Sequence, residues 1–245
     1  MLRAFYKNII AEVHLTGCIV SQSIRPLPSI GNAKRACALI NPTNKELKGT
    51  AASYFAIGKE GETQQQGFNS WGGLDIGSGQ LYATQVVDGR VCQFGGQSLV
   101  RELEKIPAKR ENVKCEPGNV VRTLSTEQLT HNFKNIIHTV SPYPTDVDAH
   151  NVLQNCYVNA LNLASELNYS IIVSPLIGNG QRGFDNETAI GAAIKGLERF
   201  GEQYEYDDTK SNNTMYLCFG LIEDSLLGEF EKAFERSNFK ILSTT

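Results

Sequence analysis

The sequence predicts a three-layer α/β/α sandwich on a central mixed, largely parallel sheet. Short apolar runs typical of buried strands alternate with longer segments whose apolar residues recur at helical spacing. The chain has 245 residues, of which 41% are hydrophobic, and this is within the size that one α/β domain reaches. We therefore expect residues 1–245 to form a single domain.

The first part of the chain predicts short strands. Residues 5–21 alternate enough to predict an edge strand or a hairpin around Gly17. Residues 36–40 predict a buried strand that stops at the tetrapeptide NPTN, residues 41–44. Open α/β sheets bind ligands at the carboxyl ends of their strands, although a plain Asx turn explains this tetrapeptide equally well.

Residues 49–85 form a long segment that is rich in Gly and Gln and shows no sustained period. A loop of this length inside a domain is either functional or disordered. Its aromatic residues favour order, because they supply apolar area that does not stay solvated. We interpret the segment as an ordered insertion beside the site, with Trp71 either against the ligand cleft or packed on the far side of the sheet.

The later elements repeat a strand and helix unit. They are a helix over residues 86–106 interrupted near Gly95 and Gly96, strands over 120–124 and 134–140, a helix capped by Asp146 or Asp148, a strand over 171–177, a helix up to residue 200, a strand over 215–222, and a last helix capped by Asp224.

A glycine loop over residues 178–183 lies between the predicted strand at 171–177 and the following helix, for which Asp185 or Asn186 offers an N-cap. Glycines let the backbone approach a ligand, and a helix N-terminus presents unpaired N–H groups to an anion. The loop therefore predicts a phosphate site. Glycine turns between strands and helices also occur for packing reasons alone.

Composition excludes several classes of function. A net charge of −3 and a pI of about 5.9 argue against a bulk nucleic-acid binder, so an anionic ligand has to be held locally by backbone donors. Six scattered cysteines without a C-x-x-C pair and no secretory segment favour an intracellular protein, cytoplasmic or nuclear. The four histidines show no metal-ligand spacing, so we expect no metal. We also expect no cofactor and no membrane association.

Four motifs in one order resemble those of macrodomains, the ADP-ribose-binding modules of the Appr-1-p processing type. LINPTN at residues 39–44 is similar to V-N-A-A-N, and VVDGRVCQFGGQSL at 86–99 to G-V-D-G-A-I-H-x-A-A-G-x-x-L. IIHTVSP at 136–142 is similar to I-H-T-V-G-P, and PLIGNGQRGF at 175–184 to P-x-I-S-T-G-x-x-G-F. The resemblance spans roughly residues 36–200, with the long insertion placed before the V-D-G motif.

The resemblance implies a role for each matching residue. Asn44 is expected to bind the distal ribose, Asn41 to brace the loop, and Phe184 to cover the ribose face. Asp88 falls where hydrolytic members carry the carboxylate that orients or deprotonates a water. The diphosphate is expected to lie on the backbone of the loop formed by Gly178, Asn179, Gly180, Gln181, Arg182 and Gly183.

The chain also departs from the family's pattern. The glycines that usually precede V-D-G are absent, and the insertion holds a rival G-G-L-D that makes Asp75 an alternative to Asp88. The motif's His is Cys92, and the adenine-binding Asp of the usual G-D-I corresponds to Cys18. Adenine recognition must therefore come from elsewhere in the pocket or be lost.

Three functions remain open. The first is a macrodomain-type hydrolase that removes mono-ADP-ribose from modified proteins or cleaves a related ADP-ribose derivative. The second is a module that binds ADP-ribose without hydrolysing it. The third is a pocket that has drifted to another nucleotide. The expected partner is ADP-ribose or an ADP-ribosylated protein, and the chain is expected to be a monomer.

Overall fold

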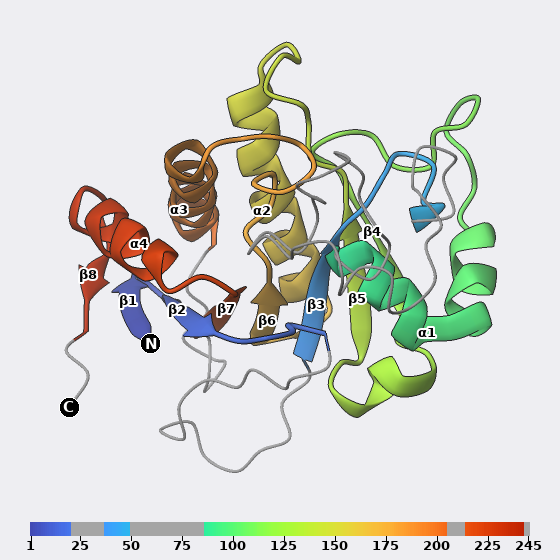
Figure 1. The fold of residues 1–245 in the computed structure, drawn as a ribbon, viewed down its shortest axis with the longest axis horizontal. Coiled ribbons are helices and arrows are strands. Elements are labelled where there is room, and N and C mark those ends of the chain that lie inside the picture. The colour runs from blue at the N-terminus through green and yellow to red at the C-terminus, as the bar shows by residue number, and fades with distance from the viewer. Residues whose placement is uncertain (21–36, 50–85, 205–213, 243–245) are drawn as a thin grey trace, which may run out of the picture.

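The computed structural model describes residues 1–20, 37–49, 86–204 and 214–242, which form one eight-stranded sheet with four α-helices. The sheet order is β4-β5-β3-β6-β7-β2-β1-β8 (Figure 1). The five strands from β5 to β2 are parallel to one another, and the pairs β4–β5, β1–β2 and β1–β8 are antiparallel. The strands are β1 Leu2–Tyr6, β2 Ile9–Leu15, β3 Cys37–Pro42, β4 Val120–Leu124, β5 Asn135–Thr139, β6 Ile171–Ser174, β7 Met215–Leu221 and β8 Lys240–Ile241.

Helices cover both faces of this sheet. One buried cluster joins α2, α3 and α4 to one face, and a second joins α1 and the 3-10 helix η4 to the other (Figure 1). The predicted mixed, largely parallel sheet between two helical layers is therefore confirmed. The helices are α1 Val87–Glu104, η4 Glu127–His131, α2 Ala149–Glu166, α3 Asn186–Gln203 and α4 Ser225–Glu235.

The first hairpin differs from the prediction. It turns at Lys7 and Asn8, where Lys7 has a φ of 50°, and not around Gly17. β2 lies inside the sheet between β1 and β7, so the edge-strand prediction is also wrong. The alternating pattern of residues 9–15 wrongly indicated an edge strand with one solvated face. Glu12, a residue type expected on such a face, is fully buried.

The helix boundaries follow the predictions more closely than the helix caps do. α1 is interrupted at Gly96, whose φ of 57° and ψ of −160° are not helical, as the paired glycines predicted. Asp185 caps α3 by accepting from the N–H of Thr188 at 2.7 Å. Asp148 occupies the N-cap position of α2, but its side chain accepts no backbone N–H of the first turn and instead accepts from the Asn151 side chain, with Nδ2 and Oδ1 2.6 Å apart.

Most of the predicted insertion, residues 50–85, lies outside the described residues, and Asp75 and Trp71 lie there too. Gly49, at the start of the segment, is described and has a φ of 56°. The six cysteines all belong to described parts of the chain, and no disulfide joins any two of them. Among the described helices, none has both the length and the apolar character needed to cross a membrane.

Candidate functional site

A pocket opens at the carboxyl edge of the parallel strands. The segments that follow β2, β3, β5, β6 and β7 all contribute to its lining, together with the first turn of α1. It encloses about 250 Å³. This is the position at which open α/β sheets bind ligands, because loops from adjacent parallel strands meet there.

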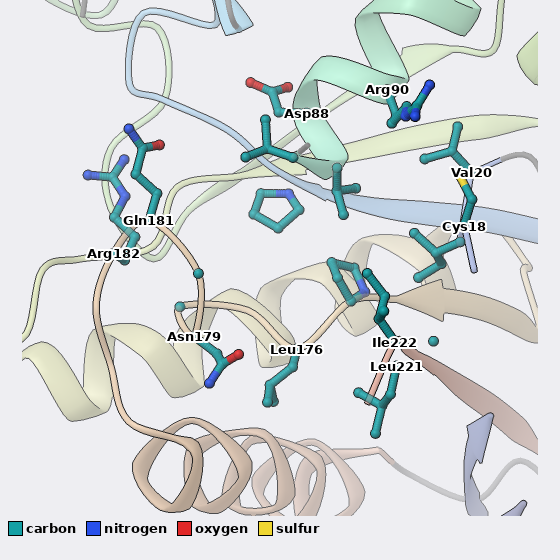
Figure 2. A pocket seen from close by; sticks show the side chains of 18 of the residues that line it. Cys18, Val20, Asp88, Arg90, Leu176, Asn179, Gln181, Arg182, Leu221 and Ile222 are labelled. Atoms are coloured by element: carbon teal, nitrogen blue, oxygen red, sulfur yellow. The ribbon is translucent and has the colours of Figure 1, made fainter. Parts of the chain in front are cut away.

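The lining divides into two ends, with Asp88 at the start of α1 between them (Figure 2). The glycine loop forms one end. The segment after β2 and the segment after β7 form the other, and their backbones are joined by a bond from Thr16 N–H to the Leu221 carbonyl oxygen at 2.8 Å. In Figure 2 the first end shows Asn179, Gln181 and Arg182, and the second shows Cys18, Val20 and Ile222.

The glycine loop leaves a run of backbone donors at the pocket. Gly178 and Gly183 have φ values of 90° and 81°, which side chains with a Cβ rarely adopt. The N–H groups of Gly183 and Phe184 donate to the carbonyl oxygens of Gly180 and Gly178 at 2.9 and 3.1 Å, so these two donors close the loop on itself. The N–H groups of residues 179–182 make no hydrogen bond with the described residues.

The helix N-terminus at the pocket is not the one that the sequence predicted. The first turn of α3 is already capped by Asp185, whereas Val86, Val87 and Asp88 of α1 line the pocket. Val86 occupies the N-cap of α1, and its apolar side chain makes no capping hydrogen bond. The dipole of α1 therefore favours negative charge at this wall of the pocket.

Asp88 is held by two donors from the segment that ends β3. Asn41 Nδ2 donates to Asp88 Oδ1 at 2.7 Å, and Thr43 Oγ1 donates to Asp88 Oδ2 at 3.0 Å. Only 7% of Asp88 is exposed, and burial raises the pKa of its carboxyl from the ordinary value to about 6, although the two hydrogen bonds oppose that rise. The carboxyl is therefore mainly ionised at neutral pH. Its pKa is close enough to neutral pH for it to accept a proton there.

The raised pKa makes stability depend on pH. Asp88 binds its proton more tightly in the folded protein than in the unfolded chain. This proton binding therefore adds to the free energy of unfolding: the added stability is fully present below about pH 4 and is lost as pH rises through about 6. Relative to Asp88→Asn, the free energy of unfolding should fall by about 3 kcal/mol between about pH 4 and about pH 7. Urea denaturation of both proteins over this range checks it, and a pH-independent difference would contradict the buried-carboxylate geometry.

The other predicted site residues lie at different depths. Asn44 lines the pocket, and its Nδ2 donates to the carbonyl oxygen of Gly49 at 2.9 Å. Asn41 is fully buried behind the wall, where it contacts Asp88. Gly183 and Phe184 are not among the lining residues, and Phe184 is buried in the core with its ring nearly perpendicular to that of exposed His150. The pocket thus brings together Asp88, Asn44 and residues 178–182.

Several lining residues were not singled out from the sequence. Ser141 follows β5, and Glu223 follows β7 at the end of the pocket that also holds Cys18. Arg182 lies over the ring of Tyr143, with its guanidinium carbon 4.4 Å from the ring centre. Ser141 and Glu223 could have been found by taking the first residues after every predicted parallel strand, since all of those strand ends meet at one edge.

One group of possible metal ligands exists in the described residues, namely Glu12, His14 and Cys218, whose ligand atoms lie within 4.8 Å of one another. The sequence did not predict it, because β2 and β7 bring Cys218 opposite Glu12. Glu12 already has a cationic neighbour, since Arg3 Nε lies 3.2 Å from one of its carboxylate oxygens. His14 Nε2 lies 3.0 Å from the other oxygen, so the carboxylate has two neighbours that can carry positive charge, and we assign no metal to the group.

Comparison with known proteins identifies relatives of the chain. The model of the Macro domain family matches residues 78–193. A Macro domain-containing protein of Listeria monocytogenes is 31% identical over 135 residues, which cover 54% of this chain and 73% of that protein. An O-acetyl-ADP-ribose deacetylase of Escherichia fergusonii is 31% identical over 117 residues. That match covers 46% of this chain and 63% of the deacetylase, which is less than two thirds of its length.

Solved structures share the fold over nearly the whole chain. The Oceanobacillus iheyensis macrodomain with ADP superposes with a TM-score of 0.64 at 17% identity, covering 96% of each chain. The Trypanosoma brucei macrodomain in complex with ADP gives a TM-score of 0.56 at 17% identity, covering 93% of this chain and 69% of that one. At such identities these similarities concern the fold.

Proposed function

Because the chain belongs to the Macro domain family, we propose that it binds ADP-ribose in the pocket at the carboxyl edge of its sheet. We also propose that it hydrolyses a bond to the distal ribose, either in proteins that carry mono-ADP-ribose or in a small ADP-ribose ester. One observation carries the proposal. A buried carboxylate with a pKa of about 6, on Asp88, lines the same pocket as the backbone donors of residues 179–182.

Binding follows from the donors at one end of the pocket. A diphosphate is an anion that an acidic protein has to hold locally, and unpaired backbone N–H groups do this without adding charge. Those groups lie in the loop from Asn179 to Arg182. The Arg182 side chain, which also lines the pocket, adds positive charge at the same end. We therefore place the diphosphate on this loop and the distal ribose towards Asp88.

The pKa of Asp88 supports the proposed hydrolysis. A general base works best when its pKa is close to the operating pH, and about 6 meets that condition near neutrality. Each carboxylate oxygen can accept a second hydrogen bond, so the bonds from Asn41 and Thr43 leave room for a water. Asp88 would orient that water towards the anomeric carbon and stabilise the positive charge that develops there.

Binding without turnover is the second candidate. Both oxygens of Asp88 already accept hydrogen bonds, and Cys92 occupies the place of the motif's histidine. A carboxylate held this firmly can serve to fix the start of α1 against β3. In that case the pocket would recognise ADP-ribose and leave the modified protein unchanged.

Two measurements test the proposal. Calorimetric titration with ADP-ribose should show binding at one site, and inorganic phosphate should compete only weakly because it lacks the ribose and the base. Incubation with a protein mono-ADP-ribosylated on glutamate or aspartate, and separately with O-acetyl-ADP-ribose, should release ADP-ribose from at least one of them. Binding without release from either substrate would favour the second candidate, and no binding would exclude both.

The far end of the pocket suggests how a purine could be recognised. Cys18 stands where the family usually has an acceptor for the adenine amino group, and Glu223 supplies a carboxylate at the same end. We expect Glu223→Ala to weaken ADP-ribose binding by roughly ten-fold, the loss of one charge-assisted hydrogen bond. Inosine diphosphate ribose carries an oxygen in place of the amino group. The Glu223→Ala variant should bind it as tightly as the unmodified protein does. Calorimetry with both ligands checks this, and equal losses would contradict it.

A further inference from the structure

A buried chain of hydrogen bonds runs from β4 to Asp88. Thr123 Oγ1 lies 2.9 Å from His138 Nε2, and His138 Nδ1 lies 3.2 Å from Asn41 Nδ2. The same Asn41 nitrogen donates to Asp88 Oδ1 at 2.7 Å, and Thr43 Oγ1 donates to Asp88 Oδ2 at 3.0 Å. Every member of the chain is buried, with exposed fractions between 0% and 8%. The proposed mechanism makes no use of His138.

The fold fixes the order of this chain. β4, β5 and β3 are neighbours in the sheet, and His138 on β5 stands directly opposite Asn41 on β3. Asp88 comes from the first turn of α1. His138 is not among the residues that line the pocket, and its contact with Asn41 is the link from its ring to Asp88.

The contacts determine where the proton of His138 lies. Burial lowers the pKa of His138 to about 3, so the imidazole is neutral and carries one proton. The amide nitrogen of Asn41 can only donate. In this orientation of the amide, Nδ1 therefore accepts from Asn41, and Nε2 carries the proton and donates to Thr123 Oγ1.

A second arrangement of His138, Asn41 and Asp88, with the Asn41 amide turned over, also satisfies the hydrogen-bonding rules. If the Asn41 amide turned over, its oxygen would meet both His138 Nδ1 and Asp88 Oδ1, and each of those atoms would have to carry a proton. The imidazole tautomer, the amide orientation and the protonation of Asp88 are thus linked. Asn41 Oδ1 is buried and makes no hydrogen bond with the described residues. The orientation of the Asn41 amide therefore depends on the contacts of Nδ2 with His138 and Asp88.

We propose that His138 is a positioning residue for Asp88: its Nδ1 atom accepts from Asn41 in the orientation in which Asn41 also donates to Asp88, and this shared donor favours the ionised carboxylate. The catalytic consequence rests on the proposed hydrolysis, whereas the positioning itself does not. His138 acts without touching the ligand, and it lowers the cost of a buried negative charge by fixing a donor.

Other titratable groups near Asp88 do not replace this contact. On α1, Arg90 Nη1 donates to Gln93 Oε1 at 2.9 Å. The side chains of Cys92 and Asp88 both lie beside Gly49. From the glycine loop, Arg182 lies over an aromatic ring. In the described part of the chain, the hydrogen bonds to the carboxylate come from β3 and the residue after it.

Two variants separate the nitrogens of His138. His138→Asn places an amide oxygen near the position of Nδ1 and can still accept from Asn41, whereas His138→Gln reaches the position of Nε2 and keeps only the contact with Thr123. Carbon-13 NMR titration should give a pKa for Asp88 near 6 in the unmodified protein and in His138→Asn, and above about 7 in His138→Gln. Asp88→Asn assigns the signal. Equal pKa values in all three proteins would overturn the proposal.

Nitrogen-15 NMR of the unmodified protein needs no substitution and so does not depend on how the variants fold. It should show His138 neutral at pH 7 with the proton on Nε2, and a proton on Nδ1 would overturn the proposal. If hydrolysis is found, the acidic limb of the pH profile of kcat should move to higher pH in His138→Gln and stay in place in His138→Asn, with Kd for ADP-ribose unchanged in both. Absence of hydrolysis contradicts the proposed enzymatic function, while the two NMR results still decide the positioning.

Discussion

The Gly180→Glu variant is expected to lose ADP-ribose binding while keeping its fold. A Cβ added at Gly180 meets nothing within 4 Å, and its φ lies outside the range that only glycine tolerates. The new carboxylate would stand in the loop on which we propose that the diphosphate lies. A like charge at about 4 Å costs about 4 kcal/mol near a protein surface, so Kd should rise roughly a thousand-fold.

The choice of glycine makes this experiment clean. At Gly178 an added Cβ would lie 3.0 Å from Leu153 and 3.1 Å from Phe184, so a substitution there would disturb the core as well as the ligand. Gly191→Glu on α3 is the matched control, because it adds the same charge where a Cβ also meets nothing within 4 Å. Calorimetry and thermal denaturation of both variants are the measurements. A folded Gly180→Glu protein with normal affinity would place the phosphate site elsewhere.

The second large effect is expected at Asp88, where Asp88→Ala should separate binding from turnover. Affinity for ADP-ribose should stay within a few-fold, because a positioned water acts on the transition state more than on the ground state. Release of ADP-ribose from a glutamate- or aspartate-linked acceptor should fall by about 10²–10⁴-fold, the usual contribution of a positioned general base. Single-turnover release and calorimetry, run on the same preparation, measure the two quantities.

The Asp88→Ala result needs two comparisons. The substitution leaves the buried donors of Asn41 and Thr43 unpaired and should cost about 1–3 kcal/mol of stability, so Asp88→Asn, which keeps the shape, should lose turnover with less loss of stability. Asp75→Ala is the matched control in the rival G-G-L-D segment, outside the described residues. Normal turnover in both the Asp88 and Asp75 variants would remove these carboxylates from catalysis and favour binding alone.

The fold was predictable because its strands and helices carry strong local patterns. The apolar run of β6 and the helical period of α3 predicted the strand and the helix on either side of the glycine loop correctly. The hairpin failed because Glu12 is buried beside Arg3 and His14, and a buried charged residue in a strand cannot be told from a solvent-facing one by alternation. β8 was missed because two residues carry too little pattern to predict a strand.

The site was predictable only in part. Of the residues that the resemblance named, Asp88, Asn44 and residues 178–182 line one pocket, whereas Asn41, Gly183 and Phe184 do not. The resemblance could not give the raised pKa of Asp88. That pKa depends on burial and on the donors Asn41 and Thr43, which in turn depend on how α1 packs against the end of β3. The part played by His138 was hidden for the same reason, since Asn41 and His138 meet only through strand pairing. Contacts between distant segments carry no signal in a single sequence.

The structure of the protein with bound ADP-ribose tests the central claim most directly. The account predicts that the diphosphate lies on the N–H groups of residues 179–182, the distal ribose beside Asp88, and the base at the end of the pocket formed by Cys18 and Glu223. Asn41 should remain hydrogen-bonded to both Asp88 and His138. A diphosphate bound away from the glycine loop, or a distal ribose at the end held by Cys18 and Glu223, would contradict the account.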